Sequence, residues 1–294
     1  MGVGKARGLM IGSMTVFGTI SLLVRAIPLA SGAIAFMRAA LAALLLGAVM
    51  LFRRERLSLG GGRRDWILMA VSGVAMGFNW ILLFEAYRYT SVAVATLGYY
   101  FAPVLVAVLC PIIFKEKTSP FSLLCFVFAT AGIAVMTFGG ADNGVGHYVG
   151  ILFALGAAVL YASVVLMNKA VGNIGATERT LVQFICAAAV LFPYTLIRGE
   201  LQLASVGAVG WICLLVVGLF HTGITYLCYF SSIKHLGGAE IAILSYIDPL
   251  VAVICSVAVL GERPGALQLL GGAVALAFAL VNEIFAARVC HKNE

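Results

Sequence analysis

Long apolar runs separated by short polar segments make up nearly the whole chain. A run of about twenty apolar residues is long enough to cross the ~30 Å hydrocarbon core of a bilayer as an α-helix. Charged residues, Pro and Gly mark where each run ends, and the short connections predict that neighbouring helices are antiparallel. The pattern predicts ten transmembrane helices, which span residues 8–27, 31–52, 66–88, 91–114, 119–138, 148–168, 177–197, 211–233, 238–260 and 265–287.

The composition excludes soluble and disordered proteins. Of the 294 residues, 63% are apolar and only 11% are charged, whereas an average soluble domain has roughly 25% charged residues. We therefore expect an all-α integral membrane protein. The first run, Gly8–Val24, is longer than the apolar part of a typical signal peptide, so we expect it to remain as a helix.

The cations predict the orientation of the chain. The net charge is +7, but the basic residues lie in short connections and form no long basic face, so no nucleic acid is expected. If the N-terminus is cytoplasmic, fourteen Lys and Arg fall on the inside and four on the outside. This excess satisfies the positive-inside rule and predicts that both termini are cytoplasmic.

The two halves of the chain resemble each other at an offset of 146 residues. We therefore expect two repeats, residues 1–145 and 146–294, each with five helices. Because five is odd, the second repeat enters the membrane from the opposite side, and such inverted repeats suit alternating access to a central cavity. The aligned pairs are Phe84 with Phe230, Tyr100 with Tyr246, Pro103 with Pro249, and Glu116 with Glu262.

Ionisable residues inside the apolar runs are few, and such residues often serve function. Arg38 could contact an anionic substrate, or it could contact a helix C-terminal carbonyl as a structural clamp. Asp248 is the best candidate for charge recognition or proton binding, although it could instead pair with Arg38. His221, beside Thr225, could carry a proton or could be a packing residue.

Uncharged polar and aromatic residues near the middle of the spans are further candidates. The hydroxyls of Tyr99, Tyr100, Tyr161 and Tyr246 need a partner in the membrane, which a hydrated cavity would supply. Asn79 and Trp80 are adjacent and cannot face the same direction. We expect Asn79 to face the cavity and to join the substrate-binding residues, together with Arg38, His221, Thr225, Asp248 and the four tyrosines.

Two prolines lie at matched positions in the fourth and ninth predicted helices. Pro103 and Pro249 each remove a backbone hydrogen bond and are expected to kink their helices. The kinks could act as gating hinges, or they could be static and only shape the packing.

Several short strings in the chain resemble a known transporter family. The chain is similar to the drug/metabolite transporter superfamily, specifically its EamA-type ten-helix exporters, and within it to bacterial exporters of aromatic amino acids. The resemblance implies a secondary transporter in the bacterial cytoplasmic (inner) membrane that exports aromatic or other large apolar amino acids from a central cavity. Gln183 departs from the repeat, because it stands where the first half has Arg38. The strings are Phe36–Ala40, Ala86–Ser91, Tyr100–Pro103, Tyr246–Pro249, Lys115-Glu116 and Gly261-Glu262.

Other functions have less support in the sequence. A transporter for another metabolite or a drug fits the same pattern. A membrane-embedded enzyme would need a catalytic or metal cluster, but the four His residues are scattered, and the seven Cys form no CxxC pair. A channel would not need matched hinged repeats. We expect no catalytic residues, metal or cofactor; the expected partners are the bilayer and an amino-acid-like molecule, and a monomer suffices for this design.

Overall fold

The computed structural model is helical throughout the part of the chain that it describes, and no β-strand occurs there. The described residues are 2–52, 62–114, 120–138, 144–171, 174–233, 235–236 and 244–292. The repeat partner Glu116 lies outside these ranges.

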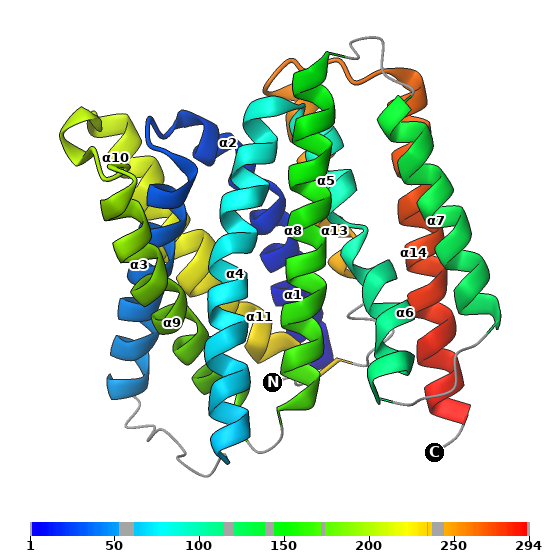
Figure 1. The fold of residues 1–294 in the computed structure, drawn as a ribbon. Coiled ribbons are helices and arrows are strands. Elements are labelled where there is room, and N and C mark those ends of the chain that lie inside the picture. Colours follow the sequence, from blue (N-terminus) through cyan, green and yellow to red (C-terminus); the bar gives the residue numbers. More distant parts are fainter. Residues whose placement is uncertain are drawn as a thin grey trace.

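The helices form one bundle, drawn in Figure 1. Within the described ranges, six are long and apolar enough to cross a membrane by length and composition, and shorter apolar helices accompany them. This arrangement confirms the predicted all-helical membrane protein of about ten helices. The elements are α1 (Val3–Gly18), α2 (Ile20–Ala26), α3 (Ser31–Phe52), α4 (Arg63–Tyr89), α5 (Val92–Tyr99), α6 (Ala102–Phe114), α7 (Pro120–Phe138), α8 (Val145–Ala170), α9 (Ala176–Ile197), η1 (Leu203–Ser205), α10 (Ala208–Leu215), η2 (Val216–Ile224), α11 (Thr225–Ile233), α13 (Ile247–Ala258) and α14 (Ala266–Lys292).

Three spans that the apolar pattern predicts as continuous α-helices depart from that form. The first is divided at Thr19 between α1 and α2, and the fourth at Tyr100 and Phe101 between α5 and α6. The eighth contains the π-helical turn η2 between α10 and α11. Hydropathy does not reveal such departures, because the residues around each of them are as apolar as the rest of the span.

The first helices of the two repeats run in opposite directions. Arg25, at the end of α2, donates hydrogen bonds to the carbonyls of Tyr87 and Thr90, so α1–α2 and α4 end on the same side. The ring of His147, at the start of α8, lies 3.0 Å from the Thr90 hydroxyl. The first helix of the second repeat therefore starts where that of the first repeat ends. Consistent with this, α1 begins and α14 ends on the same side in Figure 1.

Contacts between the repeats form the core of the bundle. Helix α4 packs against α8 and α9, α3 packs against α9, and α7 packs against α14. One close approach is at Gly73 on α4, where an added Cβ would lie 2.6 Å from the carbonyl oxygen of Gln183 on α9. Small residues allow such close packing, which stabilises helix pairs in lipid.

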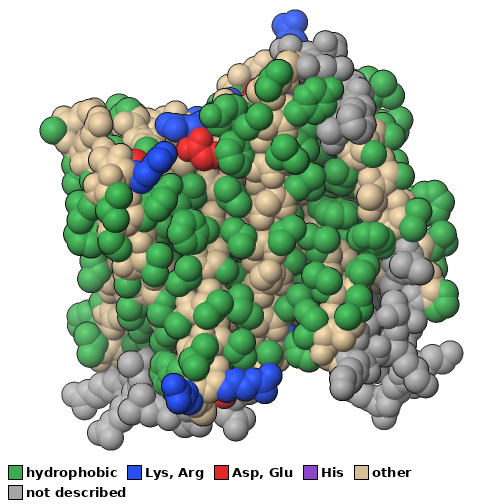
Figure 2. Space-filling view, in the orientation of Figure 1, with side chains coloured by type: hydrophobic (Ala, Val, Ile, Leu, Met, Phe, Trp, Pro, Cys, Tyr) green, Lys and Arg blue, Asp and Glu red, His purple; other side chains and the backbone are tan. Residues whose placement is uncertain are grey.

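The outer surface of the bundle is suited to lipid. Large apolar side chains such as Leu44, Leu152 and Ile185 are exposed. Figure 2 shows hydrophobic side chains over the middle of the visible face and charged side chains close to its two ends. This division matches an apolar membrane core between two polar interfaces.

Candidate functional site

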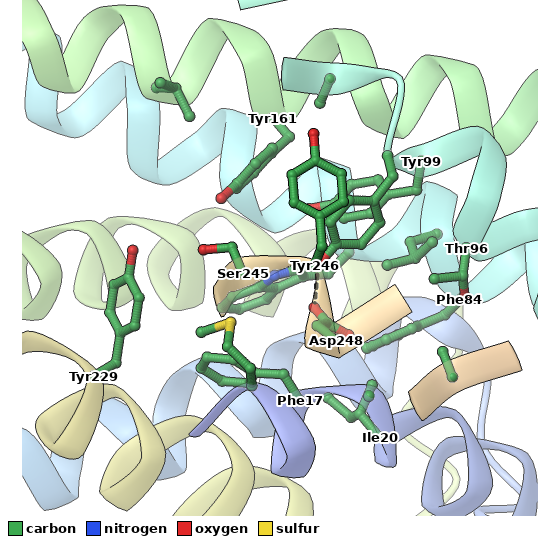
Figure 3. Close-up of a pocket in the computed structure, with 18 of the residues that line it drawn as sticks. Phe17, Ile20, Phe84, Thr96, Tyr99, Tyr161, Tyr229, Ser245, Tyr246 and Asp248 are labelled. Atoms are coloured by element: carbon green, nitrogen blue, oxygen red, sulfur yellow. Dashed lines mark hydrogen bonds between the residues drawn. The ribbon is translucent and has the colours of Figure 1, made fainter. Parts of the chain in front are cut away.

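A cavity of about 500 Å³ lies between the two repeats (Figure 3). Its walls come from α1, α2, α3, α4, α5, α6, α8, α11 and α13. Its size falls in the ~300–1,000 Å³ range of small-molecule sites. Aromatic side chains form much of the lining, namely Phe17, Trp80, Phe84, Tyr87, Tyr99, Tyr100, Tyr161, Tyr226, Tyr229 and Tyr246.

Two matched helix breaks bring tyrosines to the cavity. Tyr100 follows α5 and Tyr246 precedes α13, so both repeat-related residues lie where a helix is interrupted. Their ring centroids are 6.2 Å apart. Tyr99 contacts Tyr161 of α8 at a centroid distance of 5.4 Å, so rings from both repeats meet around the same space (Figure 3).

The prolines start the second half of each broken helix instead of kinking a continuous one. Pro103 is the second residue of α6, and Pro249 is the third residue of α13. The first turn of a helix tolerates proline because its N–H groups have no partner within the helix. The predicted kink within an uninterrupted helix is therefore wrong, whereas a gating role stays a prediction.

Asp248 lies in the first turn of α13 and faces the cavity. The Tyr100 hydroxyl donates a hydrogen bond of 2.5 Å to its Oδ2 atom, the dashed line in Figure 3. Helix α1 passes close by at Gly18, where an added Cβ would lie 2.6 Å from the Asp248 carbonyl oxygen. Asp248 thus lies between α1 and the end of α5, with its carboxylate bonded to Tyr100.

Arg38 supplies a buried cation to the cavity wall. Its side chain is only 5% exposed, and its Nε donates a hydrogen bond of 2.7 Å to the Thr222 hydroxyl. The guanidinium carbon lies 4.2 Å from the ring centroid of Trp80, which is a cation–π distance. Within the described ranges, Arg38 neither contacts a helix C-terminal carbonyl nor forms an ion pair with Asp248.

The π-helical turn η2 places the partner of Arg38. In such a turn, backbone groups pair five residues apart, and side chains shift from the faces they would occupy in an α-helix. Thr222 donates to the carbonyl five residues earlier, that of Val217, at 2.8 Å, while its hydroxyl oxygen accepts from Arg38.

Three predicted binding residues lie outside the cavity lining. Asn79 is 1% exposed and donates a hydrogen bond of 2.6 Å to the Ala157 carbonyl of α8, because its face of α4 packs against that helix. The expectation that Asn79 and not Trp80 faces the cavity is therefore wrong. Asn79 therefore lies behind the wall.

His221 and Thr225 are also placed behind the wall. The Nε2 atom of His221 lies 3.0 Å from the hydroxyl of Thr19, at the break between α1 and α2. Thr225 donates to the Phe220 carbonyl at 2.8 Å, again five residues back in the π-helical segment. The structure thus corrects their assignment as cavity residues, while Arg38, Tyr99, Tyr100, Tyr161, Tyr246 and Asp248 line the cavity.

The sequence analysis missed an aromatic face of α4. Trp80, Phe84 and Tyr87 all line the cavity and follow a spacing of four and three residues. Residues at this spacing share one face of a helix. The spacing was visible in the sequence, but aromatic residues at such intervals also occur in ordinary helix packing.

An ion pair between the repeats lies beyond one end of the cavity. Arg25 contacts Glu262, which follows α13, with 2.6 Å between Nη1 and Oε1. The Glu262 carboxylate also accepts hydrogen bonds from the backbone N–H of Val92, at 2.8 Å, and from the Ser256 hydroxyl. We call these four residues, Arg25, Val92, Ser256 and Glu262, the latch.

The latch lies about one helical turn beyond the cavity wall. The cavity residues Ile20, Thr96 and Ala252 are four or five positions from latch residues on the same helices, a rise of about 6–7.5 Å. Gly261 has φ +65°, a conformation that favours glycine, and this turn returns Glu262 to the end of α13. The latch therefore ties α2, α5 and α13 together above the cavity.

Comparisons with known proteins agree with this architecture. The model of the EamA-like transporter family matches residues 5–138 and 148–283. The uncharacterized transporter YxxF of Bacillus subtilis is 30% identical over 264 residues, which cover 89% of this chain and 84% of that protein. Protein RarD of Escherichia coli is 25% identical, over 75% of this chain and 74% of its own length. A crystal structure with 19% sequence identity has the same fold, with a TM-score of 0.64, and the similarity covers 97% of this chain and 99% of that one.

Proposed function

Because this chain belongs to the EamA-like transporter family and is a multi-pass membrane transporter, we propose that it exports aromatic and other large apolar amino acids. The observation that carries the proposal is the aromatic cavity between the repeats, which also holds one buried cation and one carboxylate, Arg38 and Asp248. Aromatic rings provide flat apolar faces for a side chain of similar character. The two charged side chains provide partners for the polar groups of the amino-acid substrate.

The proposed mechanism is alternating access. The inverted repeats allow each half to adopt the conformation that the other half has just left. If the termini are cytoplasmic, the latch lies at the outer end of the cavity, and we infer that it holds this end closed. Export then requires the latch to open after the substrate has entered from the cytoplasm. We place the protein in the bacterial cytoplasmic membrane, and one chain contains all the lining residues, so it can act as a monomer.

Transport by purified protein in liposomes tests this function. Saturable uptake is expected for radiolabelled tryptophan, phenylalanine and leucine, and each of the three should compete with the others. Vesicles without protein should show no saturable uptake. Trp80→Ala should raise the half-saturation concentration, because Trp80 lines the cavity, whereas Leu44→Ala, at an exposed position, is the matched control. If a panel of all common amino acids enters no faster than in empty vesicles, the substrate class is wrong.

A further inference from the structure

We propose that Arg38 and Asp248 form a bipolar site that selects zwitterions, in which Arg38 binds the substrate carboxylate and Asp248 binds its ammonium group. This inference rests on the proposed function, because it assigns the two ends of an amino acid within the same cavity. It predicts which analogues the cavity rejects, which the family and the aromatic lining do not specify.

The guanidinium of Arg38 has donors left for a ligand. An arginine has five N–H donors, and Arg38 uses only the Nε–H, toward Thr222. The side chain is 95% buried, yet its terminal nitrogens are not among the fully enclosed polar atoms of the described chain, and Arg38 lines the cavity. Trp80 packs against the guanidinium, with its ring centroid 4.2 Å from the guanidinium carbon. The free edge is suited to a planar carboxylate, which arginine binds with two hydrogen bonds.

Asp248 has a free acceptor on the same cavity. Tyr100 bonds Oδ2, whereas Oδ1 has no hydrogen bond to any described residue. Asp248 and Arg38 both line the cavity, and among the described residues they form no ion pair with each other. A molecule in the cavity therefore has access to both groups.

A zwitterion satisfies both groups, and a singly charged ligand does not. A buried charge without a partner is strongly unfavourable in a membrane protein. An amine would leave Arg38 without an anion, and a carboxylic acid would leave Asp248 without a cation. The neighbouring rings of Tyr99, Tyr161 and Tyr246 would hold the apolar side chain equally well in all three cases. Discrimination therefore comes from the two charged ends.

Trp80 provides a direct measure of binding at this site. In a Trp66→Phe, Trp211→Phe background, Trp80 is the single tryptophan, and it lies against Arg38. We would titrate the purified protein with phenylalanine, with phenylethylamine, which lacks the carboxylate, and with 3-phenylpropionate, which lacks the amine. Each analogue is expected to bind at least about tenfold more weakly than phenylalanine, as for the loss of one charged hydrogen-bonding group.

Variants of the two residues should then show a crossed pattern. Arg38→Gln should lower the affinity for phenylalanine and for 3-phenylpropionate at least about tenfold and leave the affinity for phenylethylamine unchanged. Asp248→Asn should lower the affinity for phenylalanine and for phenylethylamine and leave the affinity for 3-phenylpropionate unchanged. Arg88→Gln, an exposed arginine outside the cavity, is the control and should change none of the three affinities.

The outcomes separate this inference from the proposed function. If the parent protein binds and transports phenylalanine but binds both analogues as tightly as phenylalanine, the bipolar site is wrong and the transport function stands. The same conclusion follows if a folded Arg38→Gln or Asp248→Asn variant weakens all three ligands alike. If the parent protein neither binds nor transports any amino acid, the proposed substrate class itself fails. The comparison of ligands on the parent protein does not depend on whether a variant folds.

Discussion

Removal of the Glu262 carboxylate should open the latched end of the cavity. Glu262 is the one side chain through which Arg25, Val92 and Ser256 are joined in the latch. In Glu262→Ala, Arg25 keeps its hydrogen bonds to the carbonyls of Tyr87 and Thr90, but these lie in its own repeat. The change therefore removes the link among α2, α5 and α13, and leaves other contacts at this end, such as that of Thr90 with His147, in place.

The magnitude follows from the three contacts. The ion pair with Arg25 is partly exposed, with 33% and 12% exposure of the two side chains, and such pairs contribute up to about 1 kcal/mol. A carboxylate at the backbone N–H of a first helical residue, here Val92, contributes about 1 kcal/mol. The Ser256 hydrogen bond adds about 1 kcal/mol. A total of about 2–3 kcal/mol shifts the equilibrium toward the open state about 30- to 150-fold.

Thiol accessibility measures this shift. Ile20 lines the cavity on the same helix as Arg25, so Ile20→Cys is a suitable reporter in a background without the native cysteines. An impermeant thiol reagent, added on the latch side of oriented vesicles, should label this cysteine at least about tenfold faster after Glu262→Ala, which allows for non-additive contacts. Glu85→Gln is the control, because its ion pair with Arg88 is at the same end but within one helix.

The rate of labelling would also refute the reasoning. If Ile20→Cys reacts no faster with Glu262→Ala than with Glu85→Gln, the latch does not hold this end closed. A variant that reacts equally from both sides of the membrane would indicate general unfolding of the bundle, which also contradicts a local latch.

Three further predictions concern packing, orientation and the corrected site residues. Gly73→Leu should lower the melting temperature, because its Cβ would lie 2.6 Å from a carbonyl oxygen of α9 and overpacking costs about 1–3 kcal/mol. Gly12→Leu, at a position with open space around it, should leave the melting temperature unchanged. Gly144→Cys should react with an impermeant reagent from outside intact cells, and Gly62→Cys should react only after permeabilisation; the reverse pattern would place the termini outside. His221→Ala should change the affinity for phenylalanine less than about threefold, as expected for a buried residue outside the lining, and a tenfold loss would return it to the site.

The number and approximate position of the spans were predictable because they depend only on hydropathy. Each run had to be helical, since a helix satisfies its own backbone hydrogen bonds in lipid. The repeat was predictable because Pro103 and Pro249, with Tyr100 and Tyr246, recur at one offset. The residue at which each broken helix starts again was not predictable, because a proline fits both a kinked helix and the first turn of a new one.

The faces of the helices were much harder to predict than their spans. In a soluble helix, polar residues mark the face that contacts water. Here the lipid, the helix interfaces and the cavity are all lined by apolar or aromatic residues, so a polar residue has several possible directions. Asn79 bonds to a backbone carbonyl, and Trp80 faces the cavity, although the sequence favoured the opposite. His221 was misplaced for a further reason, since a π-helical turn changes the phase of the side chains.

The difference between Arg38 and Gln183 indicates that the repeats share their fold but divide their chemistry. Gln183 is buried in α9, where its amide donates to Ser72 at 2.7 Å and to Asn168 at 3.2 Å, so it joins helices away from the cavity. Arg38 lies in the corresponding helix α3 and faces the cavity. Symmetry of the backbone is sufficient for the two halves to exchange conformations, because helix packing sets that exchange. Symmetry of the side chains is not needed, because Gln183 lies among helices away from the cavity and, in the described part of the chain, Arg38 alone supplies the cation of the lining.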